Sequence, residues 1–573
     1  MLLKLPPELI LRVLRHLDLI DLLRVSQVHS KLHETIQSFP VLQYRIATQS
    51  AFVQDNKYSD LPVPERLRIL KNREEAWATC SIDFRRTIPV PHKASDIYGV
   101  TDGIYFLGDE SHHILHYVKL PSSISDEVKW EKIKVSKRLI AIGLSIYKHD
   151  LIALITLSQP KQADKNILEI QLLKFSTGTP HPHACIPVLS VRELAENHLS
   201  VSIEIAGPYL ALNVNCCSST SPKARDYLYV FDWKTGDLKM STPLALNTYS
   251  GLVILSEDTM ILPNTNTSTL DVWRIPSTRT PGGKKLTPAP WPLLSLSMPH
   301  LAPARNLFDL TCRAAANPNV TCLELATEIY SRPPSPQPPF YQAAGSAPLM
   351  VTMRVYDQVQ DIIVSWTMYA RRADVLAVCE RVLAEEEIKV DAEDLHSFGS
   401  GSSQECWILN EGPAAGWITT SAGTRCISFS PSSFQGNPLA RRSWALHVLD
   451  FNPYTIRRAT LRRAAARSSH ARGGRQLDAV EHSSVVKALL EESLPRDSLY
   501  RKSRYYFMEP VRSGGMLQCI STAVVGVGSK DSSCEWRFDG VIMDEERLVG
   551  LKAHPWTGRT SEIVVMHIGT PAV

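Results

Sequence analysis

Residues that could do covalent chemistry are present in this chain, but they are not arranged in the patterns that catalysis needs. Catalysis requires a nucleophile, a base and an orienting group in one pocket, or a cradle for phosphate or metal. The 573-residue sequence contains no Gly-Lys-Ser/Thr phosphate loop, no Gly-x-Ser-x-Gly turn and no His-Glu-x-x-His helix. The absence of a motif does not exclude chemistry, but it leaves no residues to assign to catalysis, and we expect a non-catalytic protein that needs no cofactor.

Two groups of histidines come closest to a metal-ligand pattern: His112, His113 and His116, and then His181 and His183. Structural metal ligands come in sets of three or four, and neither group has an obvious acidic or thiolate partner. The eleven cysteines are scattered and form no Cys-x-x-Cys pair, whereas zinc frameworks and secreted disulfide scaffolds need tighter spacing. We interpret the histidines as surface residues in turns, expect no metal site, and interpret the cysteines as reduced thiols of a cytoplasmic or nuclear protein.

The densest apolar pattern lies at the N-terminus, in residues 5–32. Pro6 and Pro7 suit the first turn of a helix, where Glu8 also favours the positive end of the helix dipole. Apolar residues at helical spacing then predict a helix from Glu8 to Leu17. Asp18 is a natural cap for a second helix and Ser30 for a third.

Three helices of this size cannot form a stable core alone, because domains below about 40 residues usually need disulfides, a metal or a partner. No cysteine precedes Cys80. We therefore expect a partner protein to cover this segment. The alternative is an ordinary amphipathic cap packed on its own domain, because most apolar stripes belong to a core.

The N-terminal segment resembles an F-box. The family pattern is met at Leu5, Pro6, Glu8, Val13, Leu14, Leu17, Asp18, Asp21, Leu22, Leu23, Val28, Lys31 and Leu32. The sequence departs from it mildly, with His29 where many relatives carry Cys and Tyr44 before Arg45 where they carry Trp. The resemblance covers residues 1–47 and implies binding to the Skp-family adaptor of an SCF (Skp-cullin-F-box) E3 ubiquitin ligase, with the rest of the chain holding a client protein.

Within the F-box, the apolar anchors are expected to face the Skp-family adaptor. These anchors are Leu5, Pro6, Pro7, Ile10, Leu14, Leu17, Leu22, Val25, Val28 and Leu32. A connecting helix is predicted from Pro64 to Cys80, within a linker at residues 48–82, and its Trp77 is expected to pack on the next domain.

The remainder, residues 83–573, has the pattern of an all-β domain: alternating or short apolar runs separated by Gly, Pro, Asn, Asp and Ser. A weak echo, an apolar strand ending in an aromatic residue or Asp, recurs along it. It lies at residues 115–120, 172–178, 227–236, 270–274, 353–357, 446–451 and 563–569. The run Asp232-Trp233-Lys234-Thr235-Gly236 is similar to the strand ends of WD-repeat propellers.

The first four echoes start 57, 55 and 43 residues apart, close to the roughly 40 to 50 residues of a propeller blade. The fold class predicted is therefore multidomain α+β: a small three-helix F-box followed by a large all-β domain, an irregular β-propeller of about six to eight blades. A pair of β-sandwiches is the alternative.

Three interruptions are expected in the β domain. Residues 276–348 hold 14 of the 38 prolines and are interpreted as a disordered inter-blade loop, because proline cannot continue a central strand. Residues 371–387 have the spacing of a helical insertion. Residues 457–480 form a second disordered insertion, whose stretch 457–475 contains seven arginines with no interleaved aromatic residue; it is interpreted as a solvated loop, with nuclear import or an acidic partner as alternatives.

Composition adds that 44% of residues are hydrophobic and 21% charged, with a net charge of only +4. No global field therefore favours nucleic acid or a membrane surface, and no apolar stretch is long enough for a spanning helix. The predicted function is a substrate-recognition subunit of an SCF ligase, in the cytoplasm or nucleus. A non-ligase F-box scaffold is the alternative, and sequence does not separate the two.

Overall fold

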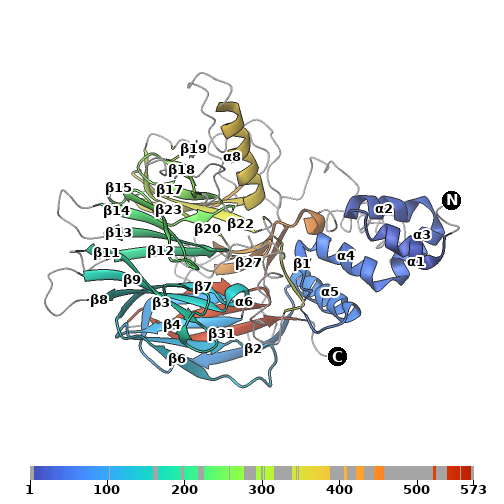
Figure 1. Ribbon diagram of the computed structural model, residues 1–573, viewed down its shortest axis with the longest axis horizontal. Helices are drawn as coiled ribbons and strands as arrows, with labels where there is room; N and C mark the ends of the chain where they lie inside the picture. Colours follow the sequence, from blue (N-terminus) through green and yellow to red (C-terminus); the bar gives the residue numbers. More distant parts are fainter. Residues whose placement is uncertain are drawn as a thin grey trace, which may run out of the picture.

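The computed structural model describes residues 5–569, apart from 58, 102, 159–165, 195–198, 217–224, 257, 277–291, 299–300, 302–303, 315–337, 344, 346, 360, 387–404, 410–420, 432–443, 457, 459–519, 524–537 and 555–556. Five helices come first. They are α1 (Pro7–Leu14), α2 (Leu19–Val28), α3 (Ser30–Ser38), α4 (Pro40–Ser50) and α5 (Val63–Thr79). We call residues 5–50, which contain α1 to α4, the head. The head stands to one side of a large body of sheets (Figure 1).

Seven antiparallel sheets make up that body in the described part of the chain. The first sheet contains β3 (Ala94–Thr101), β4 (Ile104–Asp109), β5 (Ile114–Lys119) and β6 (Trp130–Lys134). The second contains β7 (Arg138–Ser145), β8 (Leu151–Ser158), β9 (Asn166–Lys174), β10 (Thr179–Pro180) and β11 (Val188–Leu194). The third contains β12 (Leu199–Ala206), β13 (Tyr209–Cys216), β14 (Asp226–Asp232) and β15 (Leu238–Leu244).

The remaining four sheets follow the same up-and-down order. The fourth contains β16 (Val253–Ile254), β17 (Thr259–Asn264), β18 (Thr269–Arg274) and β19 (Leu294–Ser297). The fifth contains β20 (Arg305–Ala314), β22 (Pro348–Asp357), β23 (Ile362–Arg371) and β24 (Glu405–Leu409). The sixth contains β25 (Ser421–Ala422), β26 (Arg425–Pro431), β27 (Trp444–Asp450) and β28 (Ile520–Ala523). The seventh contains β29 (Gly540–Met543), β30 (Arg547–Ala553), β31 (Thr560–Ile568) and, from the start of the chain, β2 (Ile82–Pro89).

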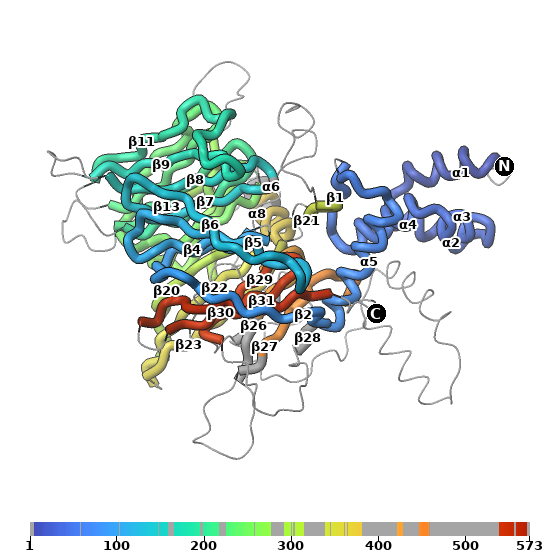
Figure 2. The backbone as a smooth tube through the Cα atoms, turned by 90° about the horizontal axis from the view of Figure 1, so that it is seen from below, coloured from blue at the N-terminus to red at the C-terminus, as the bar shows by residue number. Residues whose placement is uncertain are grey.

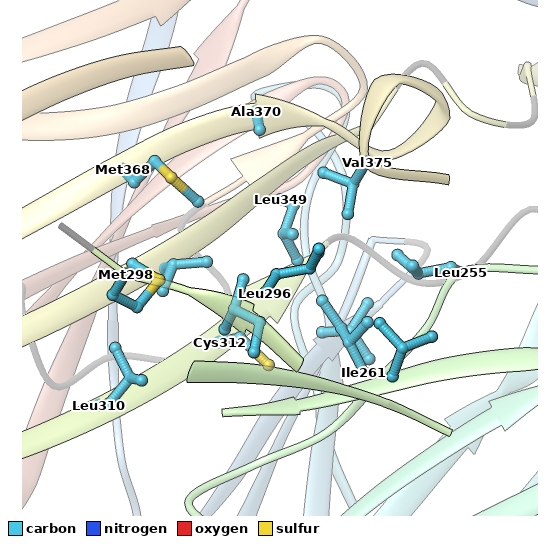
Figure 3. Close-up of a cluster of buried hydrophobic side chains, with 14 of the residues drawn as sticks. Leu255, Ile261, Leu296, Met298, Leu310, Cys312, Leu349, Met368, Ala370 and Val375 are labelled. Atoms are coloured by element: carbon cyan, nitrogen blue, oxygen red, sulfur yellow. The ribbon is translucent and has the colours of Figure 1, made fainter. Parts of the chain in front are cut away.

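The seven sheets close into a ring, because each shares a hydrophobic core with the next. For example, Leu154 and Phe106 join the first two sheets. The fourth and fifth sheets share the large cluster drawn in Figure 3, which includes Ile261 and Leu349. The seventh sheet packs back on the first through residues such as Val565 and Tyr105. In the described part of the chain, a ring of six four-stranded and one five-stranded antiparallel sheets, closed by the N-terminal strand β2, is a β-propeller with seven blades, which confirms the predicted propeller.

The weak sequence echo marks one strand of the blades. Six of its seven instances lie on the third strand of a sheet, and residues 353–357 lie on β22, the second strand of the fifth. In the third sheet, the Asp232 carboxylate accepts hydrogen bonds from the backbone N–H groups of Lys234 and Thr235, at 3.0 and 3.2 Å. The buried Trp233 donates its Nε1–H to the Gly207 carbonyl at 2.9 Å. This strand end is built as the WD-repeat resemblance implies.

The structure describes parts of two of the predicted insertions. The predicted helical insertion is confirmed as α8 (Arg372–Glu386), whose Val375 and Cys379 are buried in the core of the fourth and fifth sheets. A short helix, α6 (Ile146–His149), also joins β7 to β8. The prediction of one disordered loop over 276–348 is wrong in part, because β19, β20 and the whole of β21 (Phe340–Gln342) lie there. Because the prolines concentrate between these strands, the composition of the segment did not indicate the strands themselves. The arginine-rich stretch 457–475 lies outside the described residues, except Arg458.

A close approach between two blades gives a testable prediction about the ring. A Cβ atom added to Gly143 of β7 would lie 2.6 Å from Cδ1 of Ile203 in β12. We expect Gly143→Ala to lower the free energy of unfolding by about 1–3 kcal/mol, as overpacking does, in urea unfolding. Adding Ile203→Val removes the clashing methyl group and should restore part of the loss. A Gly143→Ala protein more stable than wild type, as relief of backbone entropy alone would give, would contradict the close packing.

Candidate protein-binding head and its junction with the propeller

The head folds through local signals that the sequence displays. Pro7 opens α1, where its missing N–H costs no hydrogen bond. Asp18 caps α2 by accepting the N–H of Asp21 at 2.7 Å. The third helix differs from expectation: its cap is His29, whose Nδ1 accepts the Lys31 N–H at 3.1 Å, and Ser30 is its first residue.

The four helices of the head bury a core of their own. Six apolar side chains are buried there: Ile10, Leu14, Leu22, Leu32, Ile36 and Leu42. The fourth helix, α4, was not among the three helices expected, and it supplies Leu42. It also crosses residue 47, so the predicted end of the F-box falls inside a helix. The premise that this segment forms no core by itself is therefore wrong, because α4 completes that core.

The predicted adaptor-facing residues divide into three groups by exposure. Leu5, Pro6, Pro7 and Val28 are exposed, and Leu17 and Val25 are half-buried. The remaining four, Ile10, Leu14, Leu22 and Leu32, are buried in the core of the head. In the unbound protein these four side chains face the interior of the head and not the solvent, because helical spacing identifies an apolar face and the neighbouring helices cover this one. From the core of the head, these four side chains support the exposed surface of its helices.

Two large apolar side chains outside the predicted adaptor-facing set lie on the open side of α1. Leu9 is 46% exposed and Val13 is 42% exposed. They are four residues apart, so they share one side of the helix, and Leu5, just before the helix, is also exposed. Their exposure indicates a surface suited to a protein partner, because large apolar side chains gathered on a small domain mark interaction sites. The four-residue spacing of Leu9 and Val13 is visible in the sequence. It did not show which side of α1 is exposed and which is buried.

The junction between head and propeller is built from α4, α5 and a small two-stranded sheet. The strand β1 (Val53–Asp55), just after the head, pairs antiparallel with β21, which lies far away in the sequence. Figure 2 shows these two strands between the head and the larger sheets. Tyr44, Val53, Leu70 and Phe340 bury one another there in a single cluster. The head therefore packs against the propeller and is not connected to it by a linker alone.

The C-terminal half of α5 docks on the sixth and seventh sheets. The buried Trp77, as predicted, packs on the next domain, and its Nε1–H donates to the Glu545 carbonyl at 2.9 Å. On the other side of the junction, Asn452 donates from Nδ2 to the Ser50 carbonyl at 2.9 Å. The rings of Phe52 and Tyr454 stack with centroids 5.6 Å apart.

A buried charge cluster joins α5 to the sixth sheet. Arg425 forms ion pairs with Glu74 of α5 and with Asp450, and Arg73 pairs with Glu74 at 3.0 Å. Burial by itself would raise the pKa of the Glu74 carboxyl, but Arg425 and Arg73 hold that pKa below its usual value. Burial raises the pKa of the Asp450 carboxyl despite Arg425. The Arg425 guanidinium also lies 5.4 Å from the ring centroid of Trp77.

The histidines do not gather into a ligand set. In the described part of the chain, no group of three or more His, Cys, Asp or Glu residues is placed to hold a metal ion. The expectation that all five histidines are surface residues is wrong for His181, which is buried, packs edge-on against Trp233 and has Nε2 2.8 Å from the His149 carbonyl. Burial lowers the pKa of His181. His116 stacks on His92 at 3.7 Å between ring centroids.

Among the residues that the structure describes, no helix combines the length and the apolar character needed to span a bilayer.

Comparison with known proteins bears on both parts of the chain. The family model of the F-box domain matches residues 2–44. No curated protein matches the chain.

Solved structures match part of the chain at low sequence identity. The structure of the Dos1 propeller matches 46% of this chain and 57% of that chain, at 9% identity and a TM-score of 0.26. The C-terminal WD40 domain of Sif2 matches 51% of this chain and 82% of that chain, at 10% identity and a TM-score of 0.24. BamB from Moraxella catarrhalis matches 50% of this chain and 75% of that chain, at 10% identity and a TM-score of 0.22.

The fold and the head together define a class of protein in which a small helical domain is joined to a β-propeller. With the match at residues 2–44, the chain carries an F-box domain at its N-terminus, followed by a propeller-like C-terminal region.

Proposed function

We propose that this protein is the substrate-recognition adaptor of an SCF E3 ubiquitin ligase. Its head binds a Skp-family adaptor, and its propeller binds a client protein. The observation that carries the proposal is an F-box at residues 2–44 that exposes Leu9 and Val13 on α1 and Leu5 just before it. Because each of these side chains is already more than half buried, covering the rest by a partner contributes about 0.5–1.5 kcal/mol.

The mechanism proposed is one of effective concentration. The adaptor and its cullin hold the conjugating enzyme, while the propeller holds the client. The client lysines therefore react with the ubiquitin thioester of the conjugating enzyme within one complex, at a high effective concentration. No residue of this chain takes part in bond making. The packed junction of α5, β1 and β21 supports this role, because a fixed distance between the two binding sites raises the effective concentration. We further propose that the protein works in the cytoplasm or nucleus.

Affinity purification of the tagged full chain from cells tests the proposal. The matched control is the same chain with Leu9→Glu and Val13→Glu, rather than a truncation at residue 47, which would cut α4. The ligase proposal predicts recovery of Skp-family adaptor, cullin and ubiquitylated clients with the wild type. The control should lose the adaptor and the cullin while keeping the clients. Recovery of adaptor without cullin or ubiquitylated protein would instead favour the non-ligase scaffold.

A further inference from the structure

One strand of the junction comes from inside the propeller. The connection from β20 to β22 leaves the fifth sheet, and its residues 338–343 run alongside β1 before the chain returns. We call residues 338–343 the strap. The polypeptide chain passes directly from the head and α5 into the propeller at β2. The strap adds a second connection between these two parts of the protein, through its pairing with β1.

The strap binds the head side through backbone groups at both of its ends. The Asn56 N–H donates to the Pro339 carbonyl at 3.2 Å, and Asn56 Nδ2 donates to the Pro338 carbonyl at 2.6 Å. At the other end, the Ala343 N–H donates to the Phe52 carbonyl at 2.8 Å. Proline has a fixed φ and no N–H, so Pro338 and Pro339 enter the pairing as acceptors only, and Asn56 supplies the donors.

A buried aromatic residue fixes the middle of the strap. Phe340 packs in the cluster that contains Tyr44 of α4 and Leu70 of α5. The Arg73 guanidinium lies 4.5 Å from the Phe340 ring centroid, which adds a cation–π contact. The strap therefore touches both α4 and α5, and it fixes the angle between the head and the junction helix.

The far side of the strap is attached to the propeller. Gln342 lies against Gly423 in the turn between β25 and β26, where an added Cβ would come within 2.3 Å of the amide nitrogen. Just beyond the strap, the Gly345 and Ala347 carbonyls accept the N–H groups of Ala373 and Arg372, at 3.4 and 3.1 Å. The strap is thus held by the sixth sheet and by the start of α8 while it holds the head.

We propose that the strap is a positioning element that sets the orientation of the head relative to the propeller. Trp77 of α5 and the Asn452–Ser50 hydrogen bond already join the head side to the sixth and seventh sheets. The strap adds a second, hydrogen-bonded backbone crossing, which restricts the remaining rotation of the head. The effect of this fixed orientation on ubiquitin transfer rests on the proposed function. The adaptor and the client would be held at one fixed separation only while the strap is paired with β1.

The test breaks the strap at Tyr341, which pairs with Gln54. Along a strand, N–H groups two residues apart point the same way, so the Tyr341 N–H faces the head as that of Ala343 does. Tyr341→Pro removes this N–H, and Tyr341→Ala is the matched control that keeps it. Phe340→Ala is a second variant, which loosens the strap without a proline.

Distances are measured in the full chain between spin labels at Glu34 in α3 and Lys119 in β5, both exposed. Genetically encoded label sites are needed because Cys185 is an exposed thiol. We expect a narrow distance distribution in wild type and Tyr341→Ala, and a broader, shifted one in Tyr341→Pro and Phe340→Ala, with loss of hydrogen-exchange protection at Val53–Asp55. Unchanged distributions in both strap variants would overturn the proposal. Thermal melting of the propeller distinguishes loosening from unfolding.

Adaptor binding separates this proposal from the function on which it rests. The strap variants should bind a purified Skp-family adaptor as wild type does and yet ubiquitylate a client more slowly. Absence of adaptor binding by the wild type would refute the proposed function and leave the distance result standing. Equal ubiquitylation by variants with broadened distances would show that orientation does not limit transfer, and it would overturn the positioning role.

Discussion

Replacing Leu9 and Val13 by glutamate should weaken binding of a purified Skp-family adaptor to the full-length protein by about 10²-fold or more. Both side chains are more than 40% exposed on α1, so the substitutions leave the core of the head intact. They remove two partly exposed apolar contacts of about 0.5–1.5 kcal/mol each and place two carboxylates in the interface, where each costs further free energy when it loses water. Isothermal titration calorimetry with wild-type and variant proteins measures this loss.

Leu14→Ala is the contrasting variant. Leu14 is fully buried in the core of the head, so its truncation should lower the stability of the head by about 2–5 kcal/mol. Circular dichroism melting should therefore change for Leu14→Ala and stay unchanged for the glutamate variant. Full adaptor affinity in Leu9→Glu/Val13→Glu would place the adaptor surface elsewhere on the head.

Arg425→Met should destabilise the junction by about 3–5 kcal/mol, as the loss of one partner from a buried ion pair does. Arg425 neutralises Glu74 of α5 and Asp450 of the sixth sheet, and all three groups are largely shielded from water. Urea unfolding should show the loss, and hydrogen exchange should localise it to α5 and the turn near Asp450. The matched control is Arg68→Met, which breaks the exposed Arg68–Glu65 pair on the same helix and should leave the urea midpoint unchanged.

The destabilisation by Arg425→Met should depend on pH. In the wild type, the lowered pKa of Glu74 gives stability that is present above the pKa of the unfolded carboxyl, about 4.3, and is lost as the pH falls through the folded value. Without Arg425, burial raises the pKa of both Glu74 and Asp450, so the variant gains relative stability as they protonate. The gap between variant and wild type should narrow from pH 7 to pH 4. A constant gap would show that packing, not charge, explains the loss.

The head shows where sequence reasoning succeeds and where it stops. Helical spacing, the leading prolines and Asp18 located α1 and α2 closely, because these signals act within a few residues. Spacing did not distinguish Leu14, which is buried, from Val13, which is exposed. That distinction depends on α4, whose weak apolar periodicity left it unrecognised, and on how four helices share their faces.

The propeller shows the same division at a larger scale. The echo that ends at Asp232 and Trp233 follows local strand and turn chemistry, so it located a recurring strand and its spacing. The pairing of β2 with β31 and of β1 with β21 joins residues hundreds of positions apart. Such pairings depend on which unpaired strand edges meet in three dimensions, so neither the closure of the seventh blade by β2 nor the strap could be inferred from periodicity.

Assembly of the complex tests the central claim most directly. The purified full-length protein is mixed with a Skp-family adaptor and its cullin, and the mass of the eluted species is measured by size-exclusion chromatography with light scattering. The account predicts a single complex containing one copy of each protein, which the Leu9→Glu/Val13→Glu variant does not form. Separate elution of the wild-type protein from the adaptor and cullin would contradict it.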